Sequence, residues 1–273
     1  MTESIAERIA ANLHAMPAGE RRAAQALVAN YPLLGLKTAA EFSSAAGTSA
    51  PTILRFVARL GFDSYPNFQA SLQEELAARL QSPLARSDIG DEARGVHPMV
   101  DATIENLRET FNHLSGKQIE EIVTLLANPR SGIHMVGGRF TDPIARYMAA
   151  HLAIVRPRVE HLGGQDGNRR DRLVDMGRKD VLVIFDIRRY QDSLLAFAES
   201  AHSRGVQIVL VTDQWLSPIA RFARHVVAGR TSVPSAWDSS AALFVIAETL
   251  IAATTRRMEE VSARRIREIE TLR

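Results

Sequence analysis

The segment Gly47–Gln69, GTSAPTILRFVARLGFDSYPNFQ, places a glycine turn directly before an amphipathic stretch that begins with polar and cationic residues. Just upstream, the segment Thr38–Ala46, TAAEFSSAA, has apolar residues at helical spacing, so the two stretches predict a helix, a turn and a second helix. In the second helix Ser49 is a suitable N-cap, and Pro51 lies in the first turn, where its missing N–H costs no hydrogen bond. This layout is typical of a helix that reads DNA.

The two faces of the second helix differ in character. Its expected buried stripe consists of Ile53, Phe56, Val57 and Leu60. The first residues of a reading helix enter the major groove, where threonine and arginine can contact base edges. We therefore expect Ser49, Thr52 and Arg55 to read bases, and Arg59, one turn further on, to contact phosphate. The complete set of expected DNA contacts is Lys37, Thr48, Ser49, Thr52, Arg55 and Arg59. By spacing alone, an ordinary helical hairpin with solvated arginines fits equally well.

The identities of the residues add to the spacing. From Thr38 onward the chain follows the pattern TxAEFxxAxGTSxPTIxRFxxxLGFxxYxxF, which closely resembles the N-terminal domain of the RpiR family of bacterial transcriptional regulators. The resemblance covers about the first eighty residues. It implies a DNA-binding regulator that works as a homodimer or homotetramer on palindromic, double-stranded operator DNA.

The composition of the chain excludes several other classes of protein. The chain has 273 residues, of which 46% are hydrophobic and 23% charged, as in a globular protein large enough for two domains. Because it has no cysteine, disulfides, thiolate zinc sites and a cysteine nucleophile are excluded. No apolar run is long enough to span a membrane and no signal peptide is evident, so we expect a cytoplasmic protein without a membrane partner. Basic and acidic residues are equal in number over residues 1–80, which predicts modest non-specific affinity for DNA.

The chain divides into three parts. Residues 1–80 are the expected all-α helix-turn-helix domain, and residues 81–97, QSPLARSDIGDEARGVH, have the composition of a linker. In residues 98–273 a helix over 98–114 precedes alternating strands and helices. The expected strands are 133–136, 158–162, 181–185, 207–211 and 225–227, the helices between them are 144–155, 191–203 and 217–223, and one or two helices follow over 239–272. This alternation predicts an α/β domain with a doubly wound parallel sheet.

The second domain resembles the SIS domain, a sugar-phosphate-binding fold that sugar isomerases and RpiR regulators share. The phrase VLVTDQWLSPIARFA over Val209–Ala223 carries the resemblance, which extends over roughly residues 115–255. The resemblance implies that a GxGxS turn after the first strand and an SxSGxT loop after the third hold a phosphate. Both loops are altered here, to Gly137-Gly138-Arg139-Phe140-Thr141 and Asp186-Ile187-Arg188-Arg189-Tyr190-Gln191. The expected effector-binding residues are Gly137, Gly138, Arg139, Thr141, Asp186, Arg188, Arg189 and Gln191.

Two outcomes are open for these loops. The three arginines can bind an anionic effector, a sugar phosphate or a sugar acid, at the carboxyl ends of the strands. Alternatively, Asp186 and Asp142 can pair with the arginines and fill the site, which would leave the domain an oligomerisation module. Asp142 followed by Pro143 is expected to cap the next helix, with the aspartate at the N-cap and the proline first in the helix.

An isomerase-like enzyme is the competing class. Glu248 is the best lone carboxylate for a general base, but a glutamate on a helix surface is the commoner explanation. The histidines lack the spacing of metal ligands, and neither a dinucleotide fingerprint nor a nucleophile elbow is present. We therefore expect no catalytic residues, no metal and no cofactor.

Overall fold

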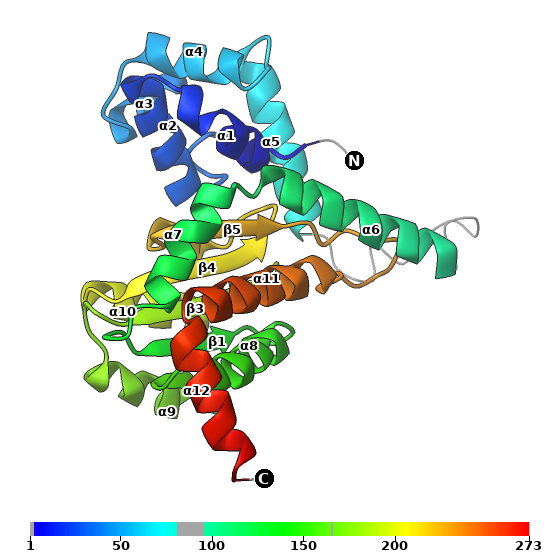
Figure 1. The fold of residues 1–273 in the computed structure, drawn as a ribbon. Coiled ribbons are helices and arrows are strands. Elements are labelled where there is room, and N and C mark those ends of the chain that lie inside the picture. The colour runs from blue at the N-terminus through cyan, green and yellow to red at the C-terminus, as the bar shows by residue number, and fades with distance from the viewer. Residues whose placement is uncertain (1–2, 81–95, 165, 273) are drawn as a thin grey trace.

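The computed structural model describes residues 3–80, 96–164 and 166–272 (Figure 1). The N-terminal part is entirely helical. Its helices are α1 (Ile5–Asn12), the 3-10 turn η1 (Leu13–Ala15), α2 (Ala18–Ala29), α3 (Ala39–Ala45), α4 (Ala50–Arg59) and α5 (Tyr65–Leu80).

Local signals explain where α3 and α4 begin and end. Thr38 caps α3 in a capping box with Glu41, which satisfies backbone N–H groups at both positions. Gly47 lies in the turn with φ +60°, a backbone conformation that favours glycine. Ser49 is the N-cap of α4, as expected. The expected stripe on α4 is buried, and the rings of Phe42 and Phe56 meet edge to face at 6.1 Å between centroids. The helix-turn-helix expected from the sequence is thereby confirmed.

The second domain is built on a five-stranded parallel sheet in the order β2-β1-β3-β4-β5. The strands are β1 (Ile133–Gly137), β2 (Val159–His161), β3 (Val181–Asp186), β4 (Gln207–Asp213) and β5 (His225–Gly229). The helices are α6 (Val96–His113), α7 (Gly116–Leu126), α8 (Asp142–Val155), α9 (Asp166–Asp171), η3 (Arg172–Asp175), α10 (Asp192–Ser203), η4 (Pro218–Arg221), α11 (Ala241–Arg257) and α12 (Glu259–Glu270).

Both faces of the sheet are covered. One core packs α7, α8, α11 and α12 against the sheet, and a second core packs α10 and η4 against the opposite face. Residues Val181–Asp186 of β3 are buried without exception, which explains why this strand is a continuous apolar run ending in one aspartate. Strand order reverses between β1 and β3, and ligands of open α/β sheets bind at such a point.

The sequence predicted most elements of this domain, and the structure differs at a few places. Within residues 217–223 the structure has only the short 3-10 helix η4. Ser217 is its N-cap, and the Ser217 side chain accepts a hydrogen bond from the Ile219 N–H. The C-terminal stretch is two helices that meet at Met258. Residues 96 and 97 of the expected linker belong to α6, and residues 81–95 lie outside the described residues. None of the helices that the structure describes has the length and apolar character needed to span a membrane.

The two domains pack directly on each other. Leu216, which follows β4, is part of the N-terminal hydrophobic core, and Val226 and Ala228 of β5 pack against the same core. A buried ion pair joins Glu7 of α1 to Arg230, with Nε–Oε1 at 2.7 Å and Nη2–Oε2 at 2.8 Å. In Figure 1 the helix α4 lies on the side of the N-terminal domain away from the sheet. The packing therefore leaves α4 open to solvent.

Candidate DNA-binding and effector sites

The start of α4 presents the three side chains that the sequence predicts to read bases. Ser49 Oγ and Thr52 Oγ1 lie 2.9 Å apart, and Arg55 Nη2 donates to Thr52 Oγ1 at 3.1 Å. Ser49 and Arg55 are exposed and Thr52 is half-buried. Ser49 makes no side-chain capping bond to the helix backbone. These three side chains thus form one hydrogen-bonded row at the N-terminal end of the helix, where such helices meet base edges.

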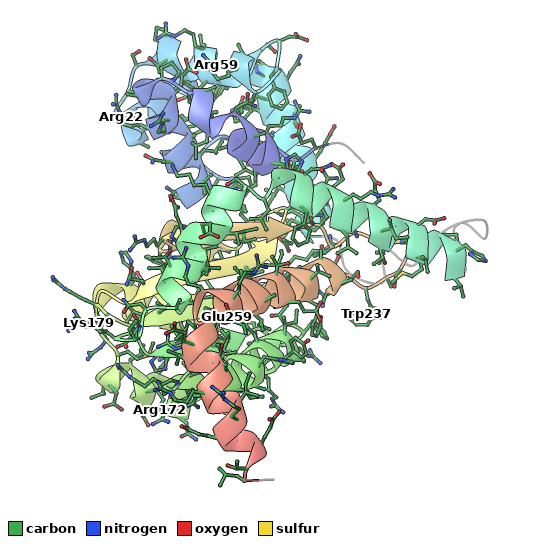
Figure 2. The ribbon with its side chains drawn as sticks, in the orientation of Figure 1. Arg22, Arg59, Arg172, Lys179, Trp237 and Glu259 are labelled. Atoms are coloured by element: carbon green, nitrogen blue, oxygen red, sulfur yellow. The ribbon has the colours of Figure 1, made fainter. Side chains whose placement is uncertain are left out.

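The other expected DNA contacts lie before α3, in the turn before α4 and at the end of α4. Lys37 is exposed just before α3, and Thr48 is half-buried in the turn. Arg59 is bonded through Nε to Glu20 of α2, whose side chain is buried. Figure 2 shows Arg59 on the outer helix of this domain, with Arg22 also on the N-terminal domain. Arg59 therefore has an intramolecular partner that competes with a phosphate, which sequence spacing did not show.

A pocket of about 210 Å³ opens at the carboxyl ends of β1 and β3. Its lining consists of Gly138, Arg139, Phe140, Thr141, Asp186, Ile187, Arg188, Arg189 and Gln191. The structure thus brings the two altered loops together around one cavity. Of the expected effector residues, Gly137 is not part of the lining, because it is buried against the start of α8.

The polar groups of the first loop, residues 137–141, are hydrogen-bonded to other groups of the protein. Gly138 N–H donates to Phe185 O at 2.9 Å and also to Thr141 Oγ1 at 2.9 Å. The Thr141 hydroxyl donates to Phe185 O at 2.5 Å and is buried. Gln191 Oε1 accepts from Arg139 N–H at 2.9 Å. The groups that would cradle a phosphate in an unaltered loop are therefore already bonded to the protein.

Helix α8 begins differently from the expectation. Its N-cap is Thr141, and Pro143 is the second helical residue, so the expected cap at Asp142 was wrong by one position. Asp142 instead lies beside His161 at the end of β2, with Oδ1 2.8 Å from Nε2. The carboxylate therefore joins the first loop to the next strand.

Asp186 lies at the floor of the pocket and is buried. Its Oδ2 accepts a hydrogen bond from Ser217 Oγ at 2.5 Å. Burial raises the pKa of Asp186 to about 7, although the Ser217 hydrogen bond opposes the rise. Asp213, at the end of β4, accepts hydrogen bonds from Tyr190 OH at 2.6 Å and Arg188 N–H at 2.5 Å. Burial also raises the pKa of Asp213, to about 6.

Arg188 is buried and fully engaged. Its Nε donates to Asp238 Oδ2 at 2.6 Å and its Nη2 bonds to Asp238 Oδ1. Its Nη1 donates to the backbone oxygen of Ala78 in α5 at 2.9 Å, and the guanidinium lies 4.2 Å above the ring of Trp215. The internal pairing considered from the sequence was therefore wrong about its partners, because Asp238 rather than Asp186 or Asp142 neutralises this arginine.

The side chains at the mouth of the pocket are exposed. Arg139, Arg189 and Gln191 are solvent-accessible, and Arg139 lies 5.3 Å from the ring centre of Phe140. Phe140 in turn meets Trp237 edge to face at 5.7 Å. Arg189 has φ +61°, a left-handed conformation, at the position where the resemblance implies glycine. The pocket thus combines two exposed guanidiniums, an aromatic rim and a buried carboxyl group of raised pKa.

Sequence reasoning missed several residues that determine this geometry. Asp213 is the last residue of β4 and Arg230 follows β5, so the rule that ligand sites gather at carboxyl ends of strands could have indicated them. Asp238 and Ala78 carry no such signal, because one lies in an irregular segment and the other contributes only its backbone oxygen.

Comparison with known proteins identifies the class of both domains. The family model of the rpiR-family helix-turn-helix domain matches residues 3–79, and that of the SIS domain matches residues 125–253. The fold and site therefore define a protein with a helix-turn-helix domain followed by a SIS domain. The chain belongs to the RpiR family of transcriptional regulators.

Solved structures share the fold of this chain. The sugar isomerase domain of an RpiR transcription factor from Sphaerobacter thermophilus is 26% identical, with a TM-score of 0.57, and the match covers 63% of this chain and 96% of that one. The Vibrio vulnificus NanR protein, solved in complex with ManNAc-6P, has 15% identity and a TM-score of 0.57 over 98% of this chain and 97% of that one. A search of curated protein sequences found no significant match.

Proposed function

We propose that this protein is a sequence-specific DNA-binding regulator of carbon-source genes that responds to a small anionic sugar derivative. The observation that carries the proposal is the row of Ser49, Thr52 and Arg55 on an outward-facing helix, joined in one chain to a pocket that presents Arg139 and Arg189. The protein acts in the cytoplasm. It works as a dimer or tetramer, because the nearly neutral N-terminal domain needs paired half-site contacts for useful affinity for DNA.

Selection of bound duplexes from a random DNA pool with the full-length chain tests DNA recognition. We expect a palindromic site to be enriched. Arg55→Ala should weaken binding to that site by about 1–3 kcal/mol and relax the preference at one base pair in each half-site. Lys37→Ala is the matched control: it should weaken binding to every sequence alike and lower the salt dependence. An unchanged preference in Arg55→Ala would remove Arg55 from the base-reading set.

Arg59→Ala is a poorer probe of phosphate contact than the sequence suggests. Its removal leaves the buried Glu20 carboxylate without its arginine, so loss of affinity would be mixed with loss of stability. The thermal stability of this variant should therefore be measured before its DNA affinity is interpreted.

The effector is an anion with hydroxyl groups, such as a sugar acid or a sugar phosphate. Arg139 and Arg189 would hold the charged group at the mouth, and Asp186 would bond a hydroxyl at the floor. Thermal melts with a panel of sugar acids and sugar phosphates should reveal a ligand that raises the melting temperature of the native chain and much less that of Arg139→Gln/Arg189→Gln. A panel that shifts neither protein would contradict this part of the proposal.

An isomerase is the alternative function. Glu248 bonds to Tyr147 OH at 3.0 Å and is not part of the pocket lining, so it does not face a ligand held between the two loops. We therefore expect no turnover when the protein is incubated with sugar phosphates, measured by loss of substrate over hours. Turnover that disappears in Glu248→Gln would favour the enzyme.

A further inference from the structure

The last turn of α5 contacts the loop that follows β3 at two places. Ala78 O accepts the hydrogen bond from Arg188 Nη1 at 2.9 Å, and the Arg79 guanidinium lies 4.3 Å above the ring of Tyr190. Tyr190 is itself held by Asp213, at 2.6 Å. The helix that ends the DNA-binding domain therefore lies against the same loop that lines the pocket.

The three bonds of the Arg188 side chain are unequal. Nε and Nη2 bond to the Asp238 carboxylate in a two-pronged ion pair, whereas Nη1 bonds to the neutral backbone oxygen of Ala78. Bonds between two ions are stronger than bonds from an ion to a neutral acceptor. An anion in the pocket would therefore draw Nη1 away from Ala78 more easily than it would break the pair with Asp238.

We propose that Arg188 is a latch that fastens α5 of the DNA-binding domain to the pocket, and that an anionic ligand opens it. This inference rests on the proposed function of the pocket as an effector site. In the unliganded protein, the guanidinium holds the carboxyl end of α5, where the helix dipole also favours a cation. When a ligand takes Nη1, the last turn of α5 loses this bond, and the position of the reading helix on DNA changes with it.

Hydrogen–deuterium exchange of the full-length chain, without ligand or DNA, tests the latch itself. The double variant Arg188→Gln/Asp238→Asn removes the guanidinium without leaving the half-buried carboxylate of residue 238 without its arginine. We expect peptides covering residues 72–80 to exchange about tenfold faster in this variant, because one charge-assisted bond no longer opposes fraying of α5. Arg189→Gln removes the adjacent exposed guanidinium and should leave exchange in residues 72–80 as in the native chain.

A second variant still tests the latch if the double variant is less stable. Arg188→Lys keeps the charge, but a single ammonium group cannot bond to both Asp238 and Ala78 as the planar guanidinium does. This variant should therefore also speed exchange in α5, while the strands of the sheet stay protected. Equal exchange of residues 72–80 in the native chain, the double variant and Arg188→Lys would overturn the latch. That result would leave the proposed DNA-binding function untouched.

The ligand step is tested with 6-phosphogluconate, which carries a carboxylate, a phosphate and hydroxyl groups. We expect it to speed exchange of residues 72–80 in the native chain severalfold and to have no such effect in the double variant. If 6-phosphogluconate raises the melting temperature but leaves exchange in α5 unchanged, the opening step is wrong. If 6-phosphogluconate does not bind at all, the proposed ligand class is wrong, and the exchange of the unliganded variants alone tests the latch.

Discussion

At the residue scale, the arginines around the pocket differ in what their guanidinium groups contact. Arg188 is buried and bonded to Asp238 and Ala78, whereas Arg139 and Arg189 are exposed. In the unliganded protein the acceptors of the buried Arg188 hold it in one orientation, whereas the exposed arginines are available to a ligand without breaking any such bond. Neighbouring residues of the same type in one loop therefore serve different purposes, which their order in the sequence does not reveal.

Asp186 should make stability depend on pH. Burial raises its pKa in the folded protein to about 7, and an unfolded aspartate titrates near 3.8. Because the folded state then binds the proton more tightly, its contribution to stability is complete at low pH and is lost as pH rises from about 4 through about 7. Asp213, with a pKa raised to about 6, acts in the same direction.

We expect Asp186→Asn to remove most of this slope, with an upper bound of about 4 kcal/mol between pH 4 and pH 8. Urea unfolding of the native chain and the variant across that range measures the difference directly. Asp192→Asn, which changes an exposed residue in the first turn of α10, is the control and should leave the slope as it is. Parallel curves for the native chain and Asp186→Asn would show that this carboxyl group titrates as it does in the unfolded chain.

At the element scale, the turn from β1 into α8 depends on the absence of a side chain. A Cβ atom on Gly137 would lie 2.3 Å from the backbone nitrogen of Asp142, where neither backbone segment can move without shifting the start of α8. We expect Gly137→Ala to destabilise the protein by about 2 kcal/mol or more and to weaken ligand binding, since Thr141 moves with the helix.

Gly116→Ala provides the comparison for this substitution. Gly116 is the first residue of α7, and a Cβ there meets no atom within 4 Å. Alanine should therefore be neutral or slightly stabilising at this position. Thermal melts of the two variants measure the effect, and equal melting temperatures would show that the β1–α8 turn adapts to a side chain.

The elements that sequence predicted well are those with complete local signals. Helix α3 lies within one residue of the predicted segment at each end, and α4 begins after its predicted N-cap, because a capping box, a glycine turn and a buried stripe all agree there. Residues 217–223 were expected to be a longer helix, but only the turn capped by Ser217 is helical, and that form is 3-10. Apolar spacing alone did not separate a full α-helix from a single capped turn.

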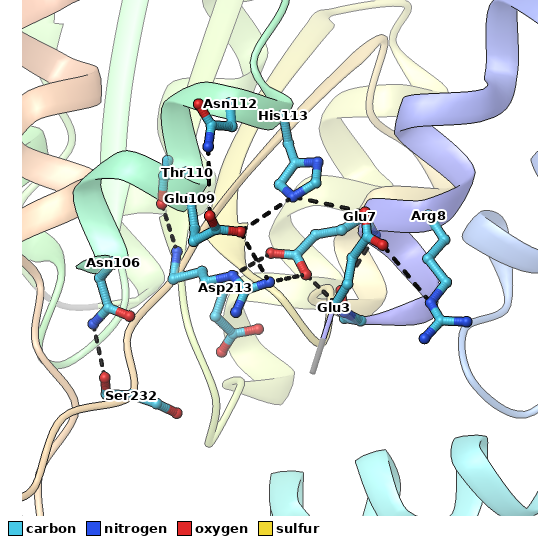
Figure 3. Close-up of polar contacts among 12 residues, drawn as sticks. Glu3, Glu7, Arg8, Asn106, Glu109, Thr110, Asn112, His113, Asp213 and Ser232 are labelled. Atoms are coloured by element: carbon cyan, nitrogen blue, oxygen red, sulfur yellow. Dashed lines mark hydrogen bonds and ion pairs between the residues drawn. The ribbon is translucent and has the colours of Figure 1, made fainter. Parts of the chain in front are cut away.

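At the scale of the whole molecule, a polar cluster fixes how the domains sit on each other. Figure 3 shows Glu3 and Glu7 of the N-terminal segment facing Glu109 and His113 of α6. The two oxygens of Glu7 accept from Arg230 Nε and Nη2, and both side chains are buried. Glu7 also accepts from the Ser4 N–H as part of a capping box. One carboxylate thus caps α1 and joins the two domains.

We expect Arg230→Met to destabilise the protein by about 3–5 kcal/mol, because it leaves the Glu7 carboxylate buried without its cation. The double variant Glu7→Gln/Arg230→Met should recover most of that loss, since the amide still accepts from Ser4 and carries no charge. Urea unfolding measures both. Arg257→Met, which removes the exposed partner of Glu120, should change stability by less than about 1 kcal/mol. A double variant as unstable as Arg230→Met would show that the lost packing, not the unpaired charge, is responsible.

The sequence by itself determined the two domains, the helix-turn-helix and the meeting of two altered loops at one edge of a parallel sheet. Each of these follows from local patterns: caps and glycine for the helices, apolar runs for the strands, and the common direction of parallel strands for the site. Only the tertiary structure decided that Asp238 and Ala78 hold Arg188 and that Glu7 holds Arg230. These partners lie far apart in the chain. Asp238 meets Arg188 within the folded second domain, whereas Ala78 and Glu7 meet their arginines because the two domains dock, and no short-range pattern records either event.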